Sequence, residues 1–287
     1  MAISNVIKLA TAVLACGLFA ACASNRQGVS SNLAKQLVVH DIVLLGEVHD
    51  NAQAHRQRTQ ALQQAMQDGW RPIIAMEQFD RQQQARLDEA MQTCTDAQCV
   101  IQKAAPDAKG WEWAYYEPVI DLALKHGLRV LAANLSRADA ASIMQHGFSS
   151  VFSAEVTHEL GLDAPLPLDL LQVQEHDVQQ GHCGLLPEQI VNGMAQAQIA
   201  RDAVMAFIVR QASQGGHKPV VLLAGNGHIL KQSGVPRWLG HADVFAVGFT
   251  ETPAASEDYD YDVVVPAFDR TDQCEALRRR FPSQSAS

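Results

Sequence analysis

The sequence predicts an α/β fold with a predominantly parallel β-sheet and helices on both faces. Apolar runs at residues 42–45, 73–76 and 220–223 have the near-continuous hydrophobicity of strands that are buried on both sides. Helical patterns lie between these runs, and strands that alternate with helices are typical of parallel sheets. Two of the runs also end alike, with a glycine followed three residues later by a histidine, as Gly46-Glu47-Val48-His49 and Gly225-Asn226-Gly227-His228.

The N-terminal segment has the features of a secretory signal. Lys8 precedes an apolar stretch at residues 9–21, which is too short to span a bilayer and has the length of a signal-peptide core. We therefore predict a cleaved signal peptide at residues 1–21. A polar tether is expected at residues 22–36, because this segment contains several Gly, Ser and Asn residues.

Cys22 is the predicted site of lipid attachment. The residues before it, Leu18-Phe19-Ala20-Ala21, are similar to the lipobox of bacterial lipoproteins, in which the cysteine is acylated. Ala23 rather than Asp follows, and by the bacterial sorting pattern this indicates the outer membrane. Cys16 is a second candidate for lipidation, and an ordinary cleaved signal peptide with a chance cysteine is the alternative.

Residues 37–270 are expected to form a single domain of alternating strands and helices, and residues 271–287 a tail. Strands are predicted at residues 42–45, 73–76, 129–133, 220–223, 244–247 and 261–265. Helices are predicted at residues 53–67, 81–91, 117–125, 137–145, 169–179 and 187–211. The acidic stretch at residues 251–261 is expected to be a loop.

Charge and cysteine content narrow the range of partners and ligands. The formal net charge is −9, which argues against nucleic acid as a partner. Signal-peptide cleavage would remove Cys16 and lipidation would occupy Cys22, which would leave four of the six cysteines in an oxidising compartment and suggests disulfides. Cys94 and Cys99 could close a local loop, and Cys183 with Cys274 would then join the tail to the body. Four cysteines allow three connectivities, and a thiolate metal site is the less favoured alternative because no C-x-x-C is present.

The strand ends carry side chains with ligand chemistry. Ligands of open α/β sheets bind outside the carboxyl ends of the strands, where Glu47, His49, Glu77 and His228 are expected to meet. Imidazole and carboxylate groups are ligands for zinc, manganese or non-haem iron. They also serve as general bases. The alternative is that both histidines only cap strand ends by hydrogen bonding to loop backbone.

A set of short motifs in a fixed order resembles one family. It begins with Leu45-Gly46-Glu47-Val48-His49-Asp50-Asn51 and continues with Met76-Glu77-Gln78-Phe79 and Ala132-Ala133-Asn134-Leu135-Ser136-Arg137. It ends with Gly181-His182-Cys183-Gly184-Leu185-Leu186-Pro187, the helical segment 197–206 and Ala224-Gly225-Asn226-Gly227-His228. Over residues 38–265 the chain is similar to the ChaN-like haem-binding lipoproteins, which belong to a wider group with the erythromycin esterase-like hydrolases and the TraB/Tiki proteins.

The resemblance implies an α/β fold and a role in haem or iron acquisition. In the hydrolase relatives the paired histidine motifs and a glutamate form the working site, which corresponds here to Glu47, His49, Glu77 and His228. The motifs do not identify the haem ligand. Haem iron takes His, Tyr, Met or Cys, and propionates pair with arginine. The candidates for haem contact are therefore His49, His182, His228, Tyr115, Tyr116, Arg137 and Arg201.

Alternatives remain for several of these residues. Tyr115 and Tyr116 lie in an aromatic cluster that could equally be a packing seam, and Arg201 next to Asp202 could be a structural ion pair. Arg237 is a further candidate anion contact.

We expect a membrane-tethered haem-binding protein of haem or iron uptake or storage rather than an enzyme. The alternative is a hydrolase, either metal-dependent with Zn, Mn or Fe, or based on the His/Glu site alone. A structural envelope lipoprotein with a vestigial site is the third reading. Haem and the lipid anchor are the expected partners, and an outer-membrane haem receptor and a homodimer are further candidates.

Overall fold

The computed structural model describes residues 31–106, 109–214, 218–270 and 272–280. The predicted signal peptide, Cys22 and residues 22–30 of the predicted tether lie outside these residues. Residues 31–37 are helical, and Leu33, Ala34 and Leu37 are buried in the core. The packed part of the chain therefore begins a few residues before the predicted boundary at residue 37, because three apolar side chains of this turn of helix cover the sheet.

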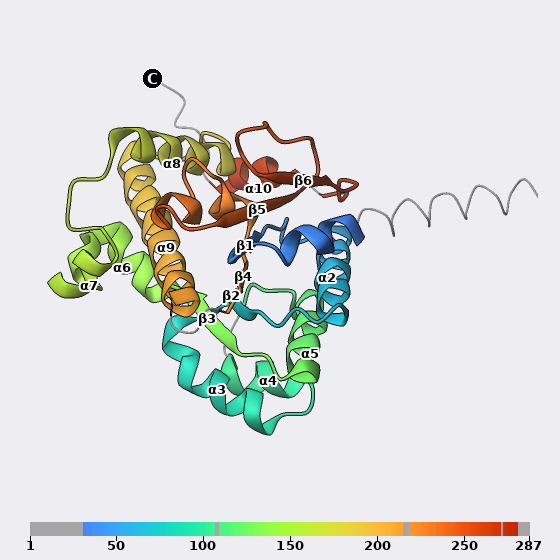
Figure 1. Cartoon of the computed structure of the whole chain (residues 1–287). Helices are drawn as coiled ribbons and strands as arrows, with labels where there is room; N and C mark the ends of the chain where they lie inside the picture. The colour runs from blue at the N-terminus through green and yellow to red at the C-terminus, as the bar shows by residue number, and fades with distance from the viewer. Residues whose placement is uncertain (1–30, 107–108, 215–217, 271, 281–287) are drawn as a thin grey trace, which may run out of the picture.

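A single six-stranded sheet forms the centre of the described structure, as the sequence predicts (Figure 1). Its strands are β1 (Ile42–Leu45), β2 (Ile73–Asp80), β3 (Val130–Asn134), β4 (Val220–Leu223), β5 (Val244–Thr250) and β6 (Tyr261–Val264). They lie in the order β3-β2-β4-β1-β5-β6, and every neighbouring pair is parallel. The prediction of a parallel sheet is thus confirmed.

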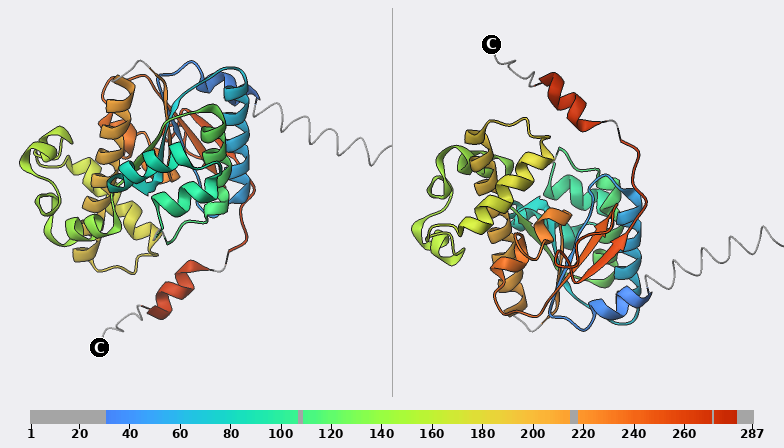
Figure 2. Two further views of the ribbon diagram at one scale, coloured as in Figure 1. Left: turned by 90° about the horizontal axis from the view of Figure 1, so that it is seen from below. Right: turned by 90° about the horizontal axis from the view of Figure 1, so that it is seen from above.

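Helices cover both faces of this sheet (Figures 1 and 2). One side carries α2 (Ala52–Gln67), α3 (Gln84–Thr93), α4 (Ala97–Ala104) and α5 (Glu117–His126). The other side carries α6 (Arg137–His146), α7 (Ala154–Glu159), α8 (Leu168–Gly181) and α9 (Glu188–Gln214). Helix α10 (Gln273–Arg280) follows β6 in the chain, and short 3-10 helices are η1 (Arg81–Gln83), η2 (Trp113–Tyr115), η3 (Phe148–Ser150), η4 (Asn226–Ile229) and η5 (Val235–Trp238).

Alternate residues of each strand point to opposite layers. Val43 and Leu45 of β1 pack with the α2–α5 layer, whereas Ile42 and Leu44 pack against the side of α9. Both sets are at most 2 % exposed. Burial on both faces explains why β1 and β4 read as unbroken apolar runs in the sequence.

The predicted elements differ from the structure mainly at their ends. The bounds of β1 and β4 are as predicted, and residues 251–260 form a loop. Strand β2 continues past Met76, so Glu77 lies inside the strand and not after it. Helices α4 and α7 were not predicted, because each is only six to eight residues long and gives little periodicity.

Two disulfides join segments of the structure. Cys94 is bonded to Cys99, next to the start of α4, and Cys183 is bonded to Cys274 in α10. These are the two pairs suggested by the spacing of the cysteines in the sequence, out of three possible connectivities. No helix within the described ranges is both long enough and apolar enough to cross a membrane.

Candidate functional site

The two glycine–histidine loops follow neighbouring strands. Strand β1 pairs with β4 over residues 42–45 and 220–223. After β1 the chain continues to β2, which lies beyond β4 in the sheet, and after β4 it continues to β5, which lies beyond β1. The two connections thus leave the β1–β4 pair in opposite directions across the sheet. The loops therefore meet at the topological switch point of the sheet, where open α/β folds bind their ligands.

Each loop approaches the other at a glycine. A Cβ atom on Gly46 would lie 2.1 Å from Oδ1 of Asn226, and one on Gly225 would lie 2.9 Å from Nε2 of His49. The amide of Asn226 also donates to the carbonyl of Glu47 at 2.9 Å. Larger residues at either glycine would force the loops apart, which gives the repeated glycine a packing role.

Glu47 is the buried centre of the first loop. Its carboxylate accepts hydrogen bonds from His49 Nδ1 at 2.8 Å, from the Arg58 guanidinium and from the Tyr116 hydroxyl. The side-chain amide of Gln78 donates weakly, at 3.4 Å, to Oε1 of Glu47, which is the oxygen bonded to His49 and Tyr116. Burial alone would raise the pKa of Glu47, but the positive charge of Arg58 and the His49 hydrogen bond outweigh it, so the pKa lies well below its usual range.

His49 is oriented by this carboxylate and faces outward. Its side chain is half exposed, and its ring lies edge-on to Trp111 with the centroids 5.0 Å apart. Burial lowers the pKa of His49, but the hydrogen bond to Glu47 and the negative charge of Glu77 together raise it by more, so the net shift of the pKa is upward. With Nδ1 donating to Glu47, Nε2 has no hydrogen-bond partner among the described residues and is the atom offered to a ligand.

His228 is held between two carboxylates. Its Nδ1 donates to Asp202 at 2.6 Å, and its Nε2 lies 3.4 Å from Oε1 of Glu77. Burial opposes the charged imidazolium, but Glu77 and Asp202 outweigh it and raise the pKa of His228 to about 10. Burial also raises the pKa of Asp202 to about 6. Glu77 accepts in addition from the Gly225 amide at 2.8 Å.

The four predicted metal ligands come together but do not form a metal site. Within the described ranges, no group of three or more His, Cys, Asp or Glu side chains is arranged to hold a metal ion. The reason is that Glu47 is occupied by Arg58 and Tyr116, whereas His228 uses both ring nitrogens on carboxylates. The metal alternative therefore has no support in the structure.

Two clefts adjoin at this site. The larger, of about 730 Å³, is lined by His49, Glu77 and His228 together with Lys109, Trp111, Asn134, Arg137, Gln198 and Arg201. The smaller, of about 420 Å³, is lined by His49, His182, Gln198, Asp202 and His228 among others. Both histidines of the paired motifs thus face both clefts, and their volumes lie in the range of small-molecule sites.

The structure separates the predicted haem contacts into those at the clefts and those away from them. His49, His182, His228, Arg137 and Arg201 are at the clefts. Tyr116 is buried with its hydroxyl on Glu47, and Tyr115 lines a separate hollow of about 320 Å³, stacked on His55. Tyr116 therefore packs against Glu47, whereas Tyr115 packs on His55 and faces a different hollow.

The arginines have different environments. Arg201 donates to Asn134 Oδ1 and to the Leu135 carbonyl, whereas the adjacent Asp202 is hydrogen bonded to His228. The two neighbours therefore have different partners and do not form the ion pair that was the alternative expectation for them. Arg137 is exposed beside Gly110 at the mouth of the larger cleft. Arg237 is paired with Asp169 at 2.8 Å and lines neither cleft.

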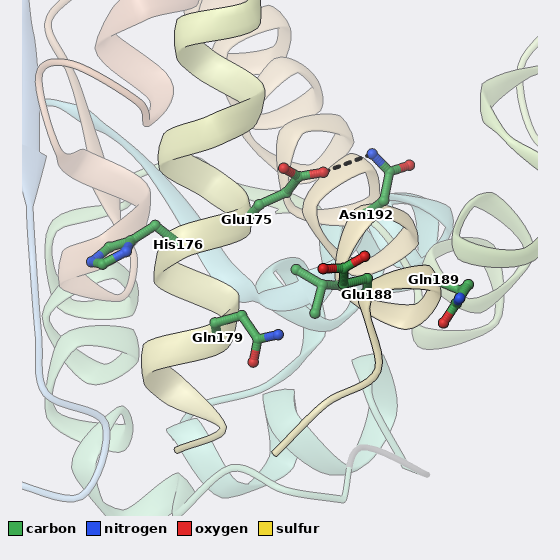
Figure 3. A pocket seen from close by; sticks show the side chains of 7 residues that line it. Glu175, His176, Gln179, Glu188, Gln189 and Asn192 are labelled. Carbon is green, nitrogen blue, oxygen red and sulfur yellow. Dashed lines mark hydrogen bonds between the residues drawn. The ribbon is translucent and has the colours of Figure 1, made fainter. Parts of the chain in front are cut away.

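Another hollow lies between α8 and α9, away from the paired histidines. Its volume is about 560 Å³, and Glu175 and Asn192 point toward one another across it and are hydrogen bonded at 2.8 Å (Figure 3). It is lined mainly by carboxylate and amide side chains, and His176 at its edge is exposed.

Sequence reasoning missed several residues of the site. Arg58 is fully buried on the core-facing side of α2, where a charged residue among Ala54, Ala61 and Leu62 is a detectable break in the apolar pattern. Lys109 and Trp111 reach the larger cleft from a loop, and no periodic signal marks them. Gln78 is 2 % exposed, its Oε1 has no hydrogen-bond partner in the part of the chain that the structure describes, and it too lines this cleft.

Comparison with known proteins identifies the family. In fold, the chain is similar to ChaN of Campylobacter jejuni, whose solved structure is described as showing cofacial haem binding, with 20% identity and a TM-score of 0.66. That match covers 80% of this chain and 89% of the other. A mutant of the erythromycin esterase EreC in its open conformation is 15% identical with a TM-score of 0.46, over 85% and 81% of the two chains.

No curated protein matches the chain. The family model described as "Haem-binding uptake, Tiki superfamily, ChaN" matches residues 33–239. This range contains both glycine–histidine loops and every residue at the two clefts named above. The chain therefore belongs to the ChaN family of haem-binding uptake proteins within the Tiki superfamily.

Proposed function

We propose that the protein binds haem in the larger cleft, with His49 as the ligand that faces the iron. The observation that carries this proposal is the state of the His49 ring: Nδ1 is hydrogen bonded to Glu47, while Nε2, on a half-exposed side chain at the cleft, has no hydrogen-bond partner within the described ranges. A hydrogen bond at one ring nitrogen orients the other toward a metal centre and increases its basicity. His228 is less suited, because both of its nitrogens face carboxylates.

The charge and shape of the cleft agree with a haem ligand. Lys109, Arg137 and Arg201 line it, and cations of this kind pair with carboxylates such as the two haem propionates. Trp111 adds an aromatic face next to His49. Haem brings the iron and the flat macrocycle, and the chain contributes an imidazole, cations and an aromatic wall.

Titration with haemin tests this proposal. We expect a saturable Soret shift at about one haem per chain, and at least a tenfold loss of affinity or a changed spectrum in His49→Ala. His158→Ala is the matched control, because the His158 side chain is 80% exposed and lines neither cleft. The absence of any shift at micromolar haemin would overturn the proposal.

We further propose that the protein is a bacterial outer-membrane lipoprotein that hands haem on during uptake. Support comes from the lipobox-like sequence that ends at Cys22 and from membership of the haem-uptake family. Incorporation of labelled palmitate into the wild type but not into Cys22→Ser would support it. Transfer of bound haem to an outer-membrane receptor would distinguish uptake from storage, and a homodimer would be detected by its mass in solution.

A hydrolase remains a second candidate because of the Glu47–His49 pair. A carboxylate that orients an imidazole, with the free Nε2 at a cleft, is the geometry of a general base. Activity on ester or amide substrates that disappears in His49→Ala would favour this function. Retained activity in that variant would exclude His49 as its base.

A further inference from the structure

The segment that follows β6 is hydrogen bonded to the loops that follow β1 and β5. We call residues 265–270 and 272–274 the C-terminal strap. It starts where the Val265 amide donates to the Thr250 carbonyl at 2.8 Å and ends at the Cys183–Cys274 disulfide. Figure 2 shows this segment leaving the body of the molecule on the way to α10.

The strap is fastened first to the loop that contains His49. The Arg270 guanidinium makes a bidentate salt bridge with Asp50, from Nε at 2.6 Å and from Nη2 at 2.5 Å. It makes a second bidentate salt bridge with Glu251, from Nη1 at 2.6 Å and from Nη2 at 2.8 Å. Asn51 donates to Glu251 and, at 2.9 Å, to the Pro266 carbonyl. Asp50 and Asn51 directly follow His49, so these bonds restrain the chain one residue from its imidazole.

Asn51 extends this connection into the fold. Its side-chain oxygen accepts from the amides of Gln53 and Ala54 and so caps the start of α2. It is 2 % exposed. The same amide group therefore joins the N-terminus of α2, the end of β5 and the strap.

The strap is fastened a second time at the turn after α8. Cys183 follows His182 and has a φ of 60°, a left-handed conformation that is uncommon for residues other than glycine. The His182 ring donates from Nδ1 to the Val178 carbonyl at 2.7 Å, and its Nε2 has no hydrogen-bond partner among the described residues. His182 lines the smaller cleft together with His49.

Helix α8 is held to α9, and the turn after α8 is closed back onto the last residues of that helix. Glu175 and Asn192 are hydrogen bonded across the α8–α9 hollow (Figure 3), and Gln179 donates to the Leu186 carbonyl at 3.0 Å. The disulfide to Cys274 is thus the covalent connection between the His182 turn and the strap.

We infer that the C-terminal strap is a positioning device for the two clefts: Arg270 holds the segment after His49, and the Cys183–Cys274 disulfide holds the turn at His182. The two contacts join residues 220 and 91 positions apart in the sequence. Each one lies next to a histidine whose Nε2 is uncommitted at the same cleft. This inference rests on the proposed haem-binding function, in which haem contacts His49 in the larger cleft, and His49 also lines the smaller cleft together with His182.

Matched variants of the full chain test the strap. Arg270→Gln removes the positive charge that holds Asp50 and Glu251, and Arg270→Lys keeps this charge but loses the bidentate hydrogen bonds. The double variant Cys183→Ser/Cys274→Ser removes the second contact. The double variant Cys94→Ser/Cys99→Ser is the control, because it removes a disulfide that lies on the opposite layer from the His182 turn.

Hydrogen–deuterium exchange on the haem-free protein is the first measurement. We expect faster exchange at residues 48–52 in Arg270→Gln and at residues 181–186 in the Cys183/Cys274 variant, and neither change in the control. Haemin titration is the second measurement. We expect at least a fivefold faster dissociation of haem and an altered Soret band in both strap variants, with partial recovery in Arg270→Lys.

The two measurements separate the two hypotheses. Exchange rates like those of the control in both strap variants would overturn the inference, and so would unchanged haem affinity and spectrum in both while the wild type binds haem. If the wild type fails to bind haemin, the proposed function fails, and the exchange data alone decide whether the strap orders the two segments.

Discussion

A Cβ atom on Gly225 would lie 2.9 Å from Nε2 of His49, so the second glycine–histidine loop holds the histidine of the first at contact distance. The two motifs are therefore one structural unit. Glu77 joins them from a third strand, because it accepts from the Gly225 amide and faces His228. This unit presents one outward imidazole, that of His49, and one imidazole locked between carboxylates, that of His228.

Replacement of Gly225 should disturb His49 without disrupting the fold. We expect Gly225→Ala to displace the His49 ring, to lower haem affinity at least tenfold, and to cost about 1–3 kcal/mol of stability through overpacking. Gly227→Ala is the control, because among the described residues, apart from its chain neighbours, no atom lies within 4 Å of the position of its Cβ. Haemin titration and urea denaturation measure both effects, and equal behaviour of the two variants would contradict the prediction.

Removal of the Tyr116 hydroxyl should destabilise the protein. Tyr116→Phe takes a hydrogen bond from the buried Glu47 carboxylate, and bonds to charged groups contribute about 1.5–3 kcal/mol. Tyr115→Phe is the control, because the Tyr115 hydroxyl has no hydrogen bond within the described ranges, and its loss should cost much less. Chemical denaturation distinguishes the two. A changed Soret band in Tyr115→Phe would instead point to this tyrosine as a haem contact.

The Arg270 network should make stability depend on pH. The hydrogen bond from Arg270 lowers the pKa of Glu251 to about 2 and also lowers the pKa of Asp50. A lowered carboxyl pKa adds stability above the ordinary value near 4.5, and this stability is lost as the pH falls toward 2. We expect Arg270→Gln to be about 1–3 kcal/mol less stable than wild type at pH 6, from its charged hydrogen bonds.

The difference in unfolding free energy between wild type and Arg270→Gln should therefore narrow between pH 4.5 and pH 2. Denaturation curves over this range provide the measurement. A difference that stays constant with pH would show that Arg270 stabilises the protein by packing and not through its two carboxylate partners.

Arg137 should contribute to binding but not to folding. It is exposed at the mouth of the larger cleft, so Arg137→Ala should weaken haemin binding about fivefold, which corresponds to about 1 kcal/mol, and leave the melting temperature unchanged. Arg237→Ala is the control, because Arg237 pairs with Asp169 away from both clefts. Similar affinities for the two variants would exclude Arg137 from the anion contacts.

Much of the fold could be predicted from local patterns. Strands β1 and β4 begin and end as expected because burial on both faces leaves an unbroken apolar run in the sequence. Helix α4 was missed because eight residues give too little periodicity, and the extension of β2 through Glu77 was missed because polar residues there face the site rather than the core.

The sequence by itself determined which residues follow two of the strands: a glycine and a histidine after β1 and again after β4. Only the tertiary structure decided that β1 and β4 are neighbours, which depends on strand order and not on sequence order. It also decided the roles of the two similar histidines. Glu47 leaves Nε2 of His49 uncommitted, while Asp202, from a helix between β3 and β4 in the chain, joins Glu77 to enclose His228. Such contacts between distant segments determine the charge and exposure of each imidazole, and no local pattern records them.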